Sequence, residues 1–344
     1  MASAALARLG KVDRGIVITK YGHSKGLLPG LICREAAHPV PDENGFSATR
    51  EAMALVGNLT AEDTVLFLLS GGGSALFEAP LLSPEELQHI TEQLLACGAD
   101  IREINTIRKR LSAVKGGRFA QLCAPAKVFQ IVLSDIVGDP LDMIASGPAC
   151  PDSSTCSQAL EIAERYQIQL SNTACTLLHQ ETPKTLTNVK TKITGSVREL
   201  CAAAAIACRS LGYEPILLTD QLDCEAREAG RFLASILRTH SGSGRKLAFL
   251  AGGETVVHLK GTGLGGRNQE LALAAASKLD GLTGAAIFSV GSDGTDGPTD
   301  AAGGYVDGDT AQSLKEKGWN LTAALENIDA YHALAQCSLS LIHI

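Results

Sequence analysis

Acidic side chains follow a run of apolar residues near the middle of the chain. Residues 128–133, VFQIVL, predict a buried strand, and the stretch Leu133–Pro148, LSDIVGDPLDMIASGP, begins where it ends. This stretch carries Asp135, Asp139 and Asp142. Open α/β sheets bind ligands beyond the carboxyl ends of their strands, so Asp135 is a candidate catalytic residue. The alternative is that these carboxylates only cap helices and turns.

A second predicted strand, residues 65–69, runs directly into a glycine-rich loop. Glycines let the backbone approach a ligand and turn its N–H groups toward an anion. The loop sequence SGGGSAL matches neither the dinucleotide-binding pattern GxGxxG nor the P-loop pattern GxxxxGK[ST]. Five residues are therefore candidates for binding a substrate or nucleotide, with a simple tight turn as the alternative: Ser70, Gly71, Gly72, Gly73 and Ser74.

A dense basic segment lies on a predicted helix over residues 101–113 and just beyond it. Apolar residues recur there at helical spacing, and five cations surround them: Arg108, Lys109, Arg110, Lys115 and Arg118. We expect most of these cations to form a solvated basic face. Lys115 precedes the pair Gly116-Gly117, so it is also a candidate for binding a phosphate.

Another glycine-rich loop, residues 261–266, ends at Arg267, where a helix is expected to begin. An arginine presented by a loop at a helix N-terminus can stabilise the charge of a transferring phosphoryl group. The alternative is a turn without phosphate in which Arg267 pairs with Glu270. Asn268 and Glu254, the latter after a further predicted strand, are also candidates for binding a substrate or nucleotide.

An acidic loop, GSDGTDGPTD, follows a predicted strand over residues 285–290. Its carboxylates at Asp293, Asp296 and Asp300 are spaced by three and four residues, and oxygen ligands of this kind suit Mg²⁺ or a nucleotide. Asp293 and Asp296 are the candidate metal ligands. The loop lacks the spacing and the closing Glu of an EF-hand, and a turn without metal is the alternative.

The composition of the 344-residue chain limits the classes of function. Its formal net charge of −7 argues against a general nucleic-acid binder. No apolar run reaches the ~18 residues of a membrane helix, and the start lacks the apolar core of a signal peptide. The ten cysteines form no CxxC pair, which indicates free thiols in a reducing compartment and therefore a cytoplasmic protein.

The pattern of strands and helices predicts an α/β fold, and the length suggests about two domains. Residues 171–187 are polar and weakly patterned, so the boundary is placed there. The expected domains are residues 1–187 and residues 188–344.

Five motifs, in their order along the chain, strongly resemble the class II glycerate kinases, the family whose C-terminal part is called the MOFRL domain. They are SGGGSAL, NTIRKRLSAVKGGRFA, SDIVGDPLDMIASGP, AGGETVVHLKGTGLGGRNQEL and GSDGTDGPTDAAGG. The similarity extends from about Ile16 to about Ala335, which is nearly the whole chain.

The resemblance implies a Rossmann-like N-terminal α/β domain and a C-terminal α/β domain whose MOFRL region covers about residues 246–336, with the active site in the cleft between them. It implies phosphorylation of D-glycerate with ATP and Mg²⁺, in most members giving 2-phosphoglycerate. Asp135 falls on the family's catalytic aspartate, and Arg267 falls on an arginine thought to help phosphoryl transfer. The SGGGSA and SDGTDGPTDAAGG loops would line the cleft.

The partners that the resemblance implies are the small molecules D-glycerate and ATP, with no nucleic acid and no membrane; a homo-oligomer is compatible with the family. Two other classes of function stay open. Members of this family have been labelled hydroxypyruvate reductases, although no GxGxxG opens a βαβ unit here with an acidic ribose ligand ~20 residues later. The third class is an inactive, truncated fragment of the kinase.

The two ends of the chain motivate that third class. Met1–Gly10 resembles the later part of the family's first helix, so the family's lysine, in a Gly-Lys-Ala-Ala segment, would lie upstream of Met1. We therefore expect slow catalysis, because one cation of the phosphoryl site would be missing. At the other end, we expect residues 338–344 to be an unrelated tail that packs poorly.

Overall fold

The computed structural model describes residues 1–24, 26, 28–134, 138, 140–337 and 340–343. Contacts between residues divide the chain into two compact units, Met1–Glu199 and Leu200–Ile344, and each is described by itself. The division falls later than the boundary expected after residue 187. Within the described ranges, no helix is long and apolar enough to cross a membrane.

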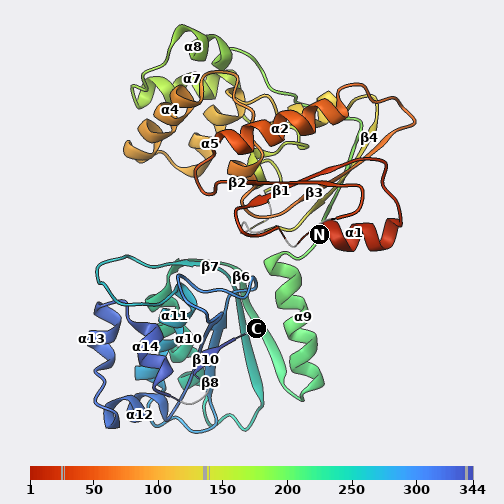
Figure 1. The fold of residues 1–344 in the computed structure, drawn as a ribbon. Helices are drawn as coiled ribbons and strands as arrows, with labels where there is room; N and C mark the ends of the chain where they lie inside the picture. Colours follow the sequence, from red (N-terminus) through yellow and green to blue (C-terminus); the bar gives the residue numbers. More distant parts are fainter. Residues whose placement is uncertain (25, 27, 135–137, 139, 338–339, 344) are drawn as a thin grey trace. The chain divides into compact units, whose positions relative to one another are not determined.

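The first unit combines helices with short strands (Figure 1). Its elements, in chain order, are α1 (Ala2–Leu9), β1 (Ile16–Lys20), β2 (Ile32–Ala36), α2 (Glu43–Val56), β3 (Thr64–Leu69), α3 (Gly73–Leu76), α4 (Pro84–Ala96), α5 (Ile101–Arg110), α6 (Arg118–Cys123), β4 (Lys127–Val132), the 3₁₀ turn η1 (Ile144–Ser146), α7 (Cys156–Arg165), α8 (Asn172–Leu178) and β5 (Val189–Ile193).

All strands of the first unit run parallel to their partners. β1 pairs with β2, and β4 lies between β3 and β5. Leu69, the last residue of β3, stands opposite Val132, the last residue of β4. The next amide, Leu133 N, donates to the Leu69 carbonyl over 2.8 Å. The SGGGSAL loop and the stretch that begins at Leu133 therefore leave the sheet side by side, at the edge where parallel sheets bind ligands.

Two apolar clusters support this edge. Phe67 of β3 packs on Phe77 and Phe119, with ring centroids 5.5 and 5.0 Å away, so α6 and the segment after α3 are fixed against the sheet. The helices α4, α5, α7 and α8 are gathered together in Figure 1, and Ile90, Ile107 and Leu178 are fully buried among them. The basic segment on α5 thus belongs to a tightly packed layer.

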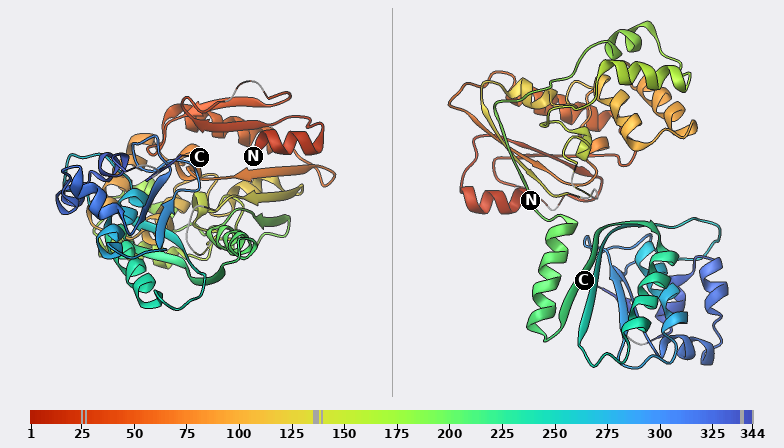
Figure 2. Two further views of the ribbon diagram at one scale, coloured as in Figure 1. Left: turned by 90° about the horizontal axis from the view of Figure 1, so that it is seen from below. Right: turned by 180° about the vertical axis from the view of Figure 1, so that it is seen from behind.

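The second unit mixes parallel and antiparallel strands (Figure 2). Helix α9 (Val197–Ser210) spans the division and is followed by β6 (Glu214–Glu225), α10 (Ala226–His240), β7 (Leu247–Val256), α11 (Arg267–Leu279), β8 (Ala286–Val290), β9 (Gly303–Asp307), α12 (Thr310–Glu316), α13 (Leu321–Glu326), α14 (Ala330–Ala335) and β10 (Leu341–Ile342). β6 and β7 are parallel, whereas β9 is antiparallel to both β8 and β10.

Helix α11 is the core of the second unit. Its residues 272–276 are completely buried, with an exposed fraction of 0% each. A Cβ atom added at Gly230 of α10 would collide with the Leu271 carbonyl oxygen, so glycine at this position lets α10 and α11 touch. Since α11 begins at Arg267, the packing of this helix in the core fixes the backbone position of that arginine.

The strands β6 and β7 are long. β6 continues to Glu225, and β7 continues to Val256 through Glu254, which was expected to follow the strand rather than to lie in it. The two strands stay paired to Glu225 and Val256 because the register shifts between Leu217 and Leu222 accommodate extra residues. Glu254 therefore lies within a strand, opposite Asp223.

The expectation of a poorly packed C-terminal tail is wrong for the residues that the structure describes there. Leu341 and Ile342 pair with Gly304 and Gly303 of β9. Ser340 is only 2% exposed, and its carbonyl accepts a hydrogen bond of 2.7 Å from Tyr305 N. This short segment is thus part of the sheet of the second unit.

Candidate functional site

The glycine-rich loop after β3 is shaped by two glycines. Gly72 has a φ of 82°, in the left-handed region that favours glycine. A Cβ on Gly73 would lie 2.6 Å from the Cβ of Ala145, so only glycine lets this loop contact η1. Ser70 and Gly71 are exposed, while Gly72, Gly73 and Ser74 are half-buried. The loop therefore keeps accessible backbone next to the stretch LSDIVGDPLDMIASGP.

That stretch contains an unusual backbone segment at its C-terminal end. Ala145, Ser146 and Gly147 all have left-handed backbones, with φ of 50°, 60° and 64°. For residues other than glycine such a conformation costs about 1–3 kcal/mol each, and it clusters at functional sites. Gly116 N and Gly117 N fasten the segment by donating to the carbonyls of Ser146 and Gly147 over 2.9 and 2.7 Å. Three glycine-containing segments thus meet at this edge of the sheet.

The acidic candidates of this stretch divide into two groups. Asp135 and Asp139 lie outside the described residues. Asp142 accepts hydrogen bonds from Lys109 Nζ at 3.3 Å and from Ser153 Oγ at 2.9 Å. Asp142 is therefore already paired with a buried cation.

The basic segment is not a solvated face, and that expectation is wrong for three of its cations. Lys109, Arg110 and Lys115 are 2%, 0% and 0% exposed and are among the largest fully buried side chains. Lys109 pairs with Asp152 at 3.0 Å as well as with Asp142. Burial is tolerated because each cation has acidic partners, which lie far from the basic segment in the sequence.

Lys115 contacts the backbone of the glycine-rich loop from the buried side of the loop. Its Nζ donates to the Ser74 carbonyl at 2.5 Å and forms an ion pair with Glu78 at 2.9 Å. Burial and, to a smaller extent, the nearby Arg108 together lower the pKa of Lys115 to about 8, against the opposing effect of Glu78. The structure thus ties Lys115 to the loop's backbone rather than to its outer surface.

In the second unit, two of the predicted site residues pair with each other. Arg267, at the first position of α11, forms an ion pair with Glu254 of β7, and both side chains are about half exposed (48% and 50%). The alternative pairing of Arg267 with Glu270 is wrong: Glu270 is buried and pairs with Arg227 at 2.5 Å. Burial raises the pKa of Glu270, against the opposing effect of Arg227. The Arg267 guanidinium therefore faces solvent beside Glu254.

Asp296 holds the start of α11. Its Oδ1 accepts from Asn268 N at 3.0 Å and Asn268 Nδ2 at 3.1 Å, and its Oδ2 accepts from Gln269 N at 2.8 Å. Asn268 Oδ1 in turn accepts from Ser289 Oγ at 2.6 Å. Burial raises the pKa of Asp296, and the hydrogen bonds from Asn268 and Gln269 oppose that rise. Asp296 and Asn268 thus position the first turn of the helix that carries Arg267.

Asp293, the other candidate metal ligand, is exposed. Its carboxylate accepts from Thr295 N at 3.2 Å and Thr295 Oγ1 at 3.1 Å, which shapes the acidic loop. No group of three or more His, Cys, Asp or Glu side chains suited to a metal ion is found among the residues that the structure describes. The assignment of Asp293 and Asp296 as metal ligands stays a prediction.

Replacing Asp296 by alanine should destabilise the protein. The change leaves two backbone N–H groups and the Asn268 amide without their acceptor, a loss of about 1–3 kcal/mol. Thermal melting measures the effect, and Asp293→Ala, which removes an exposed carboxylate of the same loop, is the matched control and should change stability by less than about 0.5 kcal/mol. Equal melting temperatures for both variants would argue against the helix-positioning role of Asp296.

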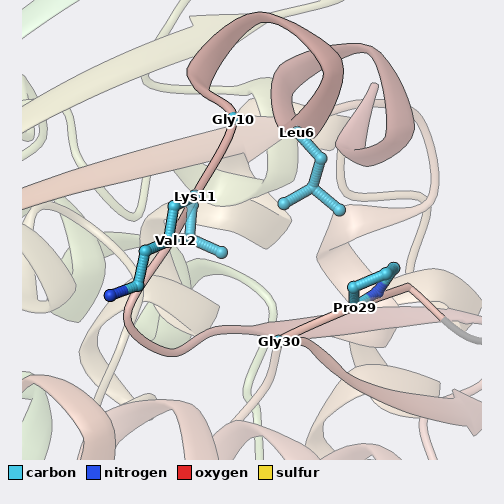
Figure 3. Close-up of a pocket in the computed structure, with 6 residues that line it drawn as sticks. All are labelled: Leu6, Gly10, Lys11, Val12, Pro29 and Gly30. Carbon is cyan, nitrogen blue, oxygen red and sulfur yellow. The ribbon is translucent and has the colours of Figure 1, made fainter.

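A pocket of about 290 Å³ lies elsewhere in the first unit (Figure 3). It is lined by Leu6, Gly10, Lys11, Val12, Pro29 and Gly30. None of these residues belongs to the predicted site, and the Lys11 side chain is 87% exposed, with its Nζ 4.0 Å from Asp13 Oδ1. We assign no chemistry to this pocket.

Comparisons with known proteins match both parts of the chain. The domain of unknown function DUF4147 matches residues 1–179, and the MOFRL family matches residues 247–343. A D-glycerate 2-kinase from Thermotoga maritima is 53% identical over an alignment of 349 positions, which covers 99% of this chain and 84% of that protein. A protein from Agrobacterium vitis, provisionally named a hydroxypyruvate reductase, is 39% identical over 97% of this chain and 78% of its own length.

A solved structure agrees with these matches. The crystal structure of a glycerate kinase from Thermotoga maritima is similar with a TM-score of 0.96 and 53% sequence identity, covering 100% of this chain and 84% of that one. The expectation of an α/β fold is thereby confirmed.

Proposed function

Because the chain belongs to the glycerate kinase family that combines DUF4147 and MOFRL domains, we propose that it transfers the γ-phosphoryl group of ATP to D-glycerate. The observation that carries the proposal is the 53% identity to a D-glycerate 2-kinase over 99% of the chain. The residues support it, because glycine-rich backbone, a solvent-facing guanidinium and carboxylates are the groups that phosphoryl transfer needs.

In the proposed reaction, a hydroxyl oxygen of glycerate forms a bond to the γ-phosphorus as the bond to the β–γ bridging oxygen breaks. Asp135 accepts the hydroxyl proton and orients the attacking oxygen. The backbone of Ser70, Gly71, Gly72, Gly73 and Ser74 binds an anionic group of a substrate. Arg267 stabilises the charge of the transferring group, with Glu254 holding its guanidinium between turnovers.

Mg²⁺ would accompany ATP, and the two candidate ligands, Asp293 and Asp296, differ in how accessible their carboxylates are to the ion. Both oxygens of Asp296 already accept hydrogen bonds from α11, whereas the Asp293 carboxylate is exposed. Mg²⁺ is commonly held by one or two carboxylates together with phosphate oxygens and water, so the single carboxylate of Asp293 would be sufficient on the protein's side. When bound, the ion would neutralise charge on the β- and γ-phosphates.

Asp293→Ala should raise the Mg²⁺ concentration that gives half-maximal activity, because one ligand of the ion is lost. Titration of activity with MgCl₂ at saturating glycerate measures the shift. Asp309→Ala, which removes a carboxylate at the start of the distant helix α12, is the control. An unchanged Mg²⁺ dependence in the Asp293 variant would remove this residue from the site.

We also propose that the product is 2-phosphoglycerate, that the enzyme acts without nucleic-acid or membrane partners, and that it works in the cytoplasm. The name of the Thermotoga relative supports the first point. All ten cysteines lie in the described ranges and are unpaired, which supports a reducing compartment.

Hydroxypyruvate reduction is the second candidate function, because the Agrobacterium relative carries that name. The GxGxxG spacing does occur in GTGLGG, residues 261–266, but the strands on either side do not form the βαβ unit by which Rossmann domains bind a dinucleotide: β7 pairs with β6, whereas β8 pairs antiparallel with β9. Oxidation of NADH by hydroxypyruvate in the absence of ATP would support the reductase, and its absence alongside kinase activity would support the kinase.

A further inference from the structure

We propose that Lys115, together with Glu78 and Arg108, is a positioning group that fixes the glycine-rich loop in its binding conformation without touching the substrate. The inference rests on the proposed function, because it assigns the loop Ser70–Ser74 to substrate binding. The three side chains are called the loop anchor below. The loop anchor acts through one atom of the loop, the carbonyl oxygen of Ser74.

Two cations converge on that carbonyl. Lys115 Nζ donates to Ser74 O at 2.5 Å, and Arg108 Nη2 donates to the same oxygen at 3.3 Å. Both cations also face Glu78, at 2.9 Å from Lys115 and 3.7 Å from Arg108. The Ser74 peptide is therefore held by charge-assisted hydrogen bonds, which are stronger than neutral ones and define its orientation.

The loop anchor is enclosed by protein. The side chains of Lys115 and Glu78 are 0% exposed, and that of Arg108 is 14% exposed. Lys115 therefore cannot reach a substrate from its present position. Its location next to Gly116 and Gly117, which fasten the left-handed Ser146 and Gly147, connects the anchor to the stretch that carries the candidate catalytic aspartate.

Such a cluster is a costly way to hold a fold together. Buried ion pairs are weak evidence for stability, since apolar residues of similar volume often serve as well or better. Glu78 is anchored through its backbone, with Glu78 N donating to Thr49 Oγ1 at 3.1 Å. Its Oε1 has no hydrogen-bond partner among the described residues, which an arrangement built for stability alone would avoid. We therefore assign these buried charges the role of orienting the Ser74 carbonyl.

The anchor also predicts a pH dependence. Two charged groups face Lys115: Glu78, in the segment after α3, and Arg108 of α5. Next to them, Lys109, Asp142 and Asp152 form a second charged cluster around Gly116. With a pKa of about 8, Lys115 loses its proton as the pH rises through that value. The hydrogen bond to the Ser74 carbonyl then loses its charge assistance and weakens, so kcat/KM should fall above about pH 8.

The main test is the double variant Lys115→Met with Glu78→Gln. Lys115→Met alone leaves a buried carboxylate without its nearest counter-charge and can prevent folding, whereas the double variant removes both charges at once. We expect kcat/KM for glycerate or ATP to fall by roughly 100-fold, as for other misplacements of about 1 Å in a site. Hydrogen exchange at residues 72–77 should become faster.

Lys115→Arg is the conservative variant. It keeps a cation that can donate to Ser74, so activity should recover to within about tenfold of wild type. Because a guanidinium stays protonated, the loss of kcat/KM above about pH 8 should disappear. A purely structural lysine would show neither effect.

Leu94→Ala controls for general loss of stability, because Leu94 is fully buried in the cluster around Ile90, away from the loop. It should lower the melting temperature and keep the wild-type kcat/KM. Wild-type kinetics and wild-type loop exchange in the double variant would overturn the proposal. If the wild-type protein shows no kinase activity, the proposed function fails, and hydrogen exchange in the loop still decides whether the anchor holds it.

Discussion

Replacing Asp135 by asparagine should lower kcat by roughly 10²–10⁴-fold, the contribution of a positioned general base. Asparagine keeps the size and shape of the side chain but cannot accept the hydroxyl proton. In the sequence, Asp135 comes three residues after Val132, the last residue of β4. The carboxyl end of β4 lies beside the start of the glycine-rich loop, because Leu133 N donates to the Leu69 carbonyl.

The matched control for this variant is Asp13→Asn, which makes the same chemical change at a carboxylate that is 97% exposed. It should leave kcat and melting temperature unchanged. A folded Asp135→Asn protein with near-normal kcat would contradict the assignment of Asp135 as the base, whatever its effect on the KM for glycerate.

Replacing Arg267 by lysine should lower kcat by roughly 10²–10³-fold, the loss typical for one electrostatic contact to the transition state. Lysine keeps the positive charge but lacks the planar fork that binds two phosphoryl oxygens at once. The KM for glycerate should change much less, because the contact forms mainly in the transition state. The stability should change by no more than about 1 kcal/mol, since the pair with Glu254 is half exposed.

Arg245→Lys is the matched control, because Arg245 forms a comparably exposed pair with Glu214 in the same unit. It should keep full activity. If Arg267→Lys lowered only the melting temperature, or matched Arg245→Lys in kcat, Arg267 would be a structural residue.

Local sequence rules account well for where the loops of the site begin. The strand predicted over residues 65–69 is confirmed as β3, and the strand predicted over 128–133 matches β4 to within a residue at each end. These features depend on neighbouring residues, so the sequence is enough to find them.

The burial of the basic segment could not be found in this way. A lysine is read as solvated because most lysines are, and the acidic partners of this segment come from distant parts of the chain. Glu78, which follows α3 in the sequence, pairs with Lys115, and Asp152, which follows η1, pairs with Lys109. The same holds for Asp296, which caps α11 from 28 residues further along the chain. The sequence feature that could have indicated burial is the glycine pair Gly116-Gly117 directly after Lys115.

The most direct test of the account is to add the purified protein and MgCl₂ to a mixture of glycerate and ATP and to follow the phosphorus-containing species by ³¹P nuclear magnetic resonance. Slow turnover is sufficient, because the identity of the products decides the question. The account predicts ADP and 2-phosphoglycerate in equal amounts, and neither product when ATP or glycerate is left out. Absence of any phosphorylated glycerate, with hydroxypyruvate-dependent oxidation of NADH in the same preparation, would contradict it.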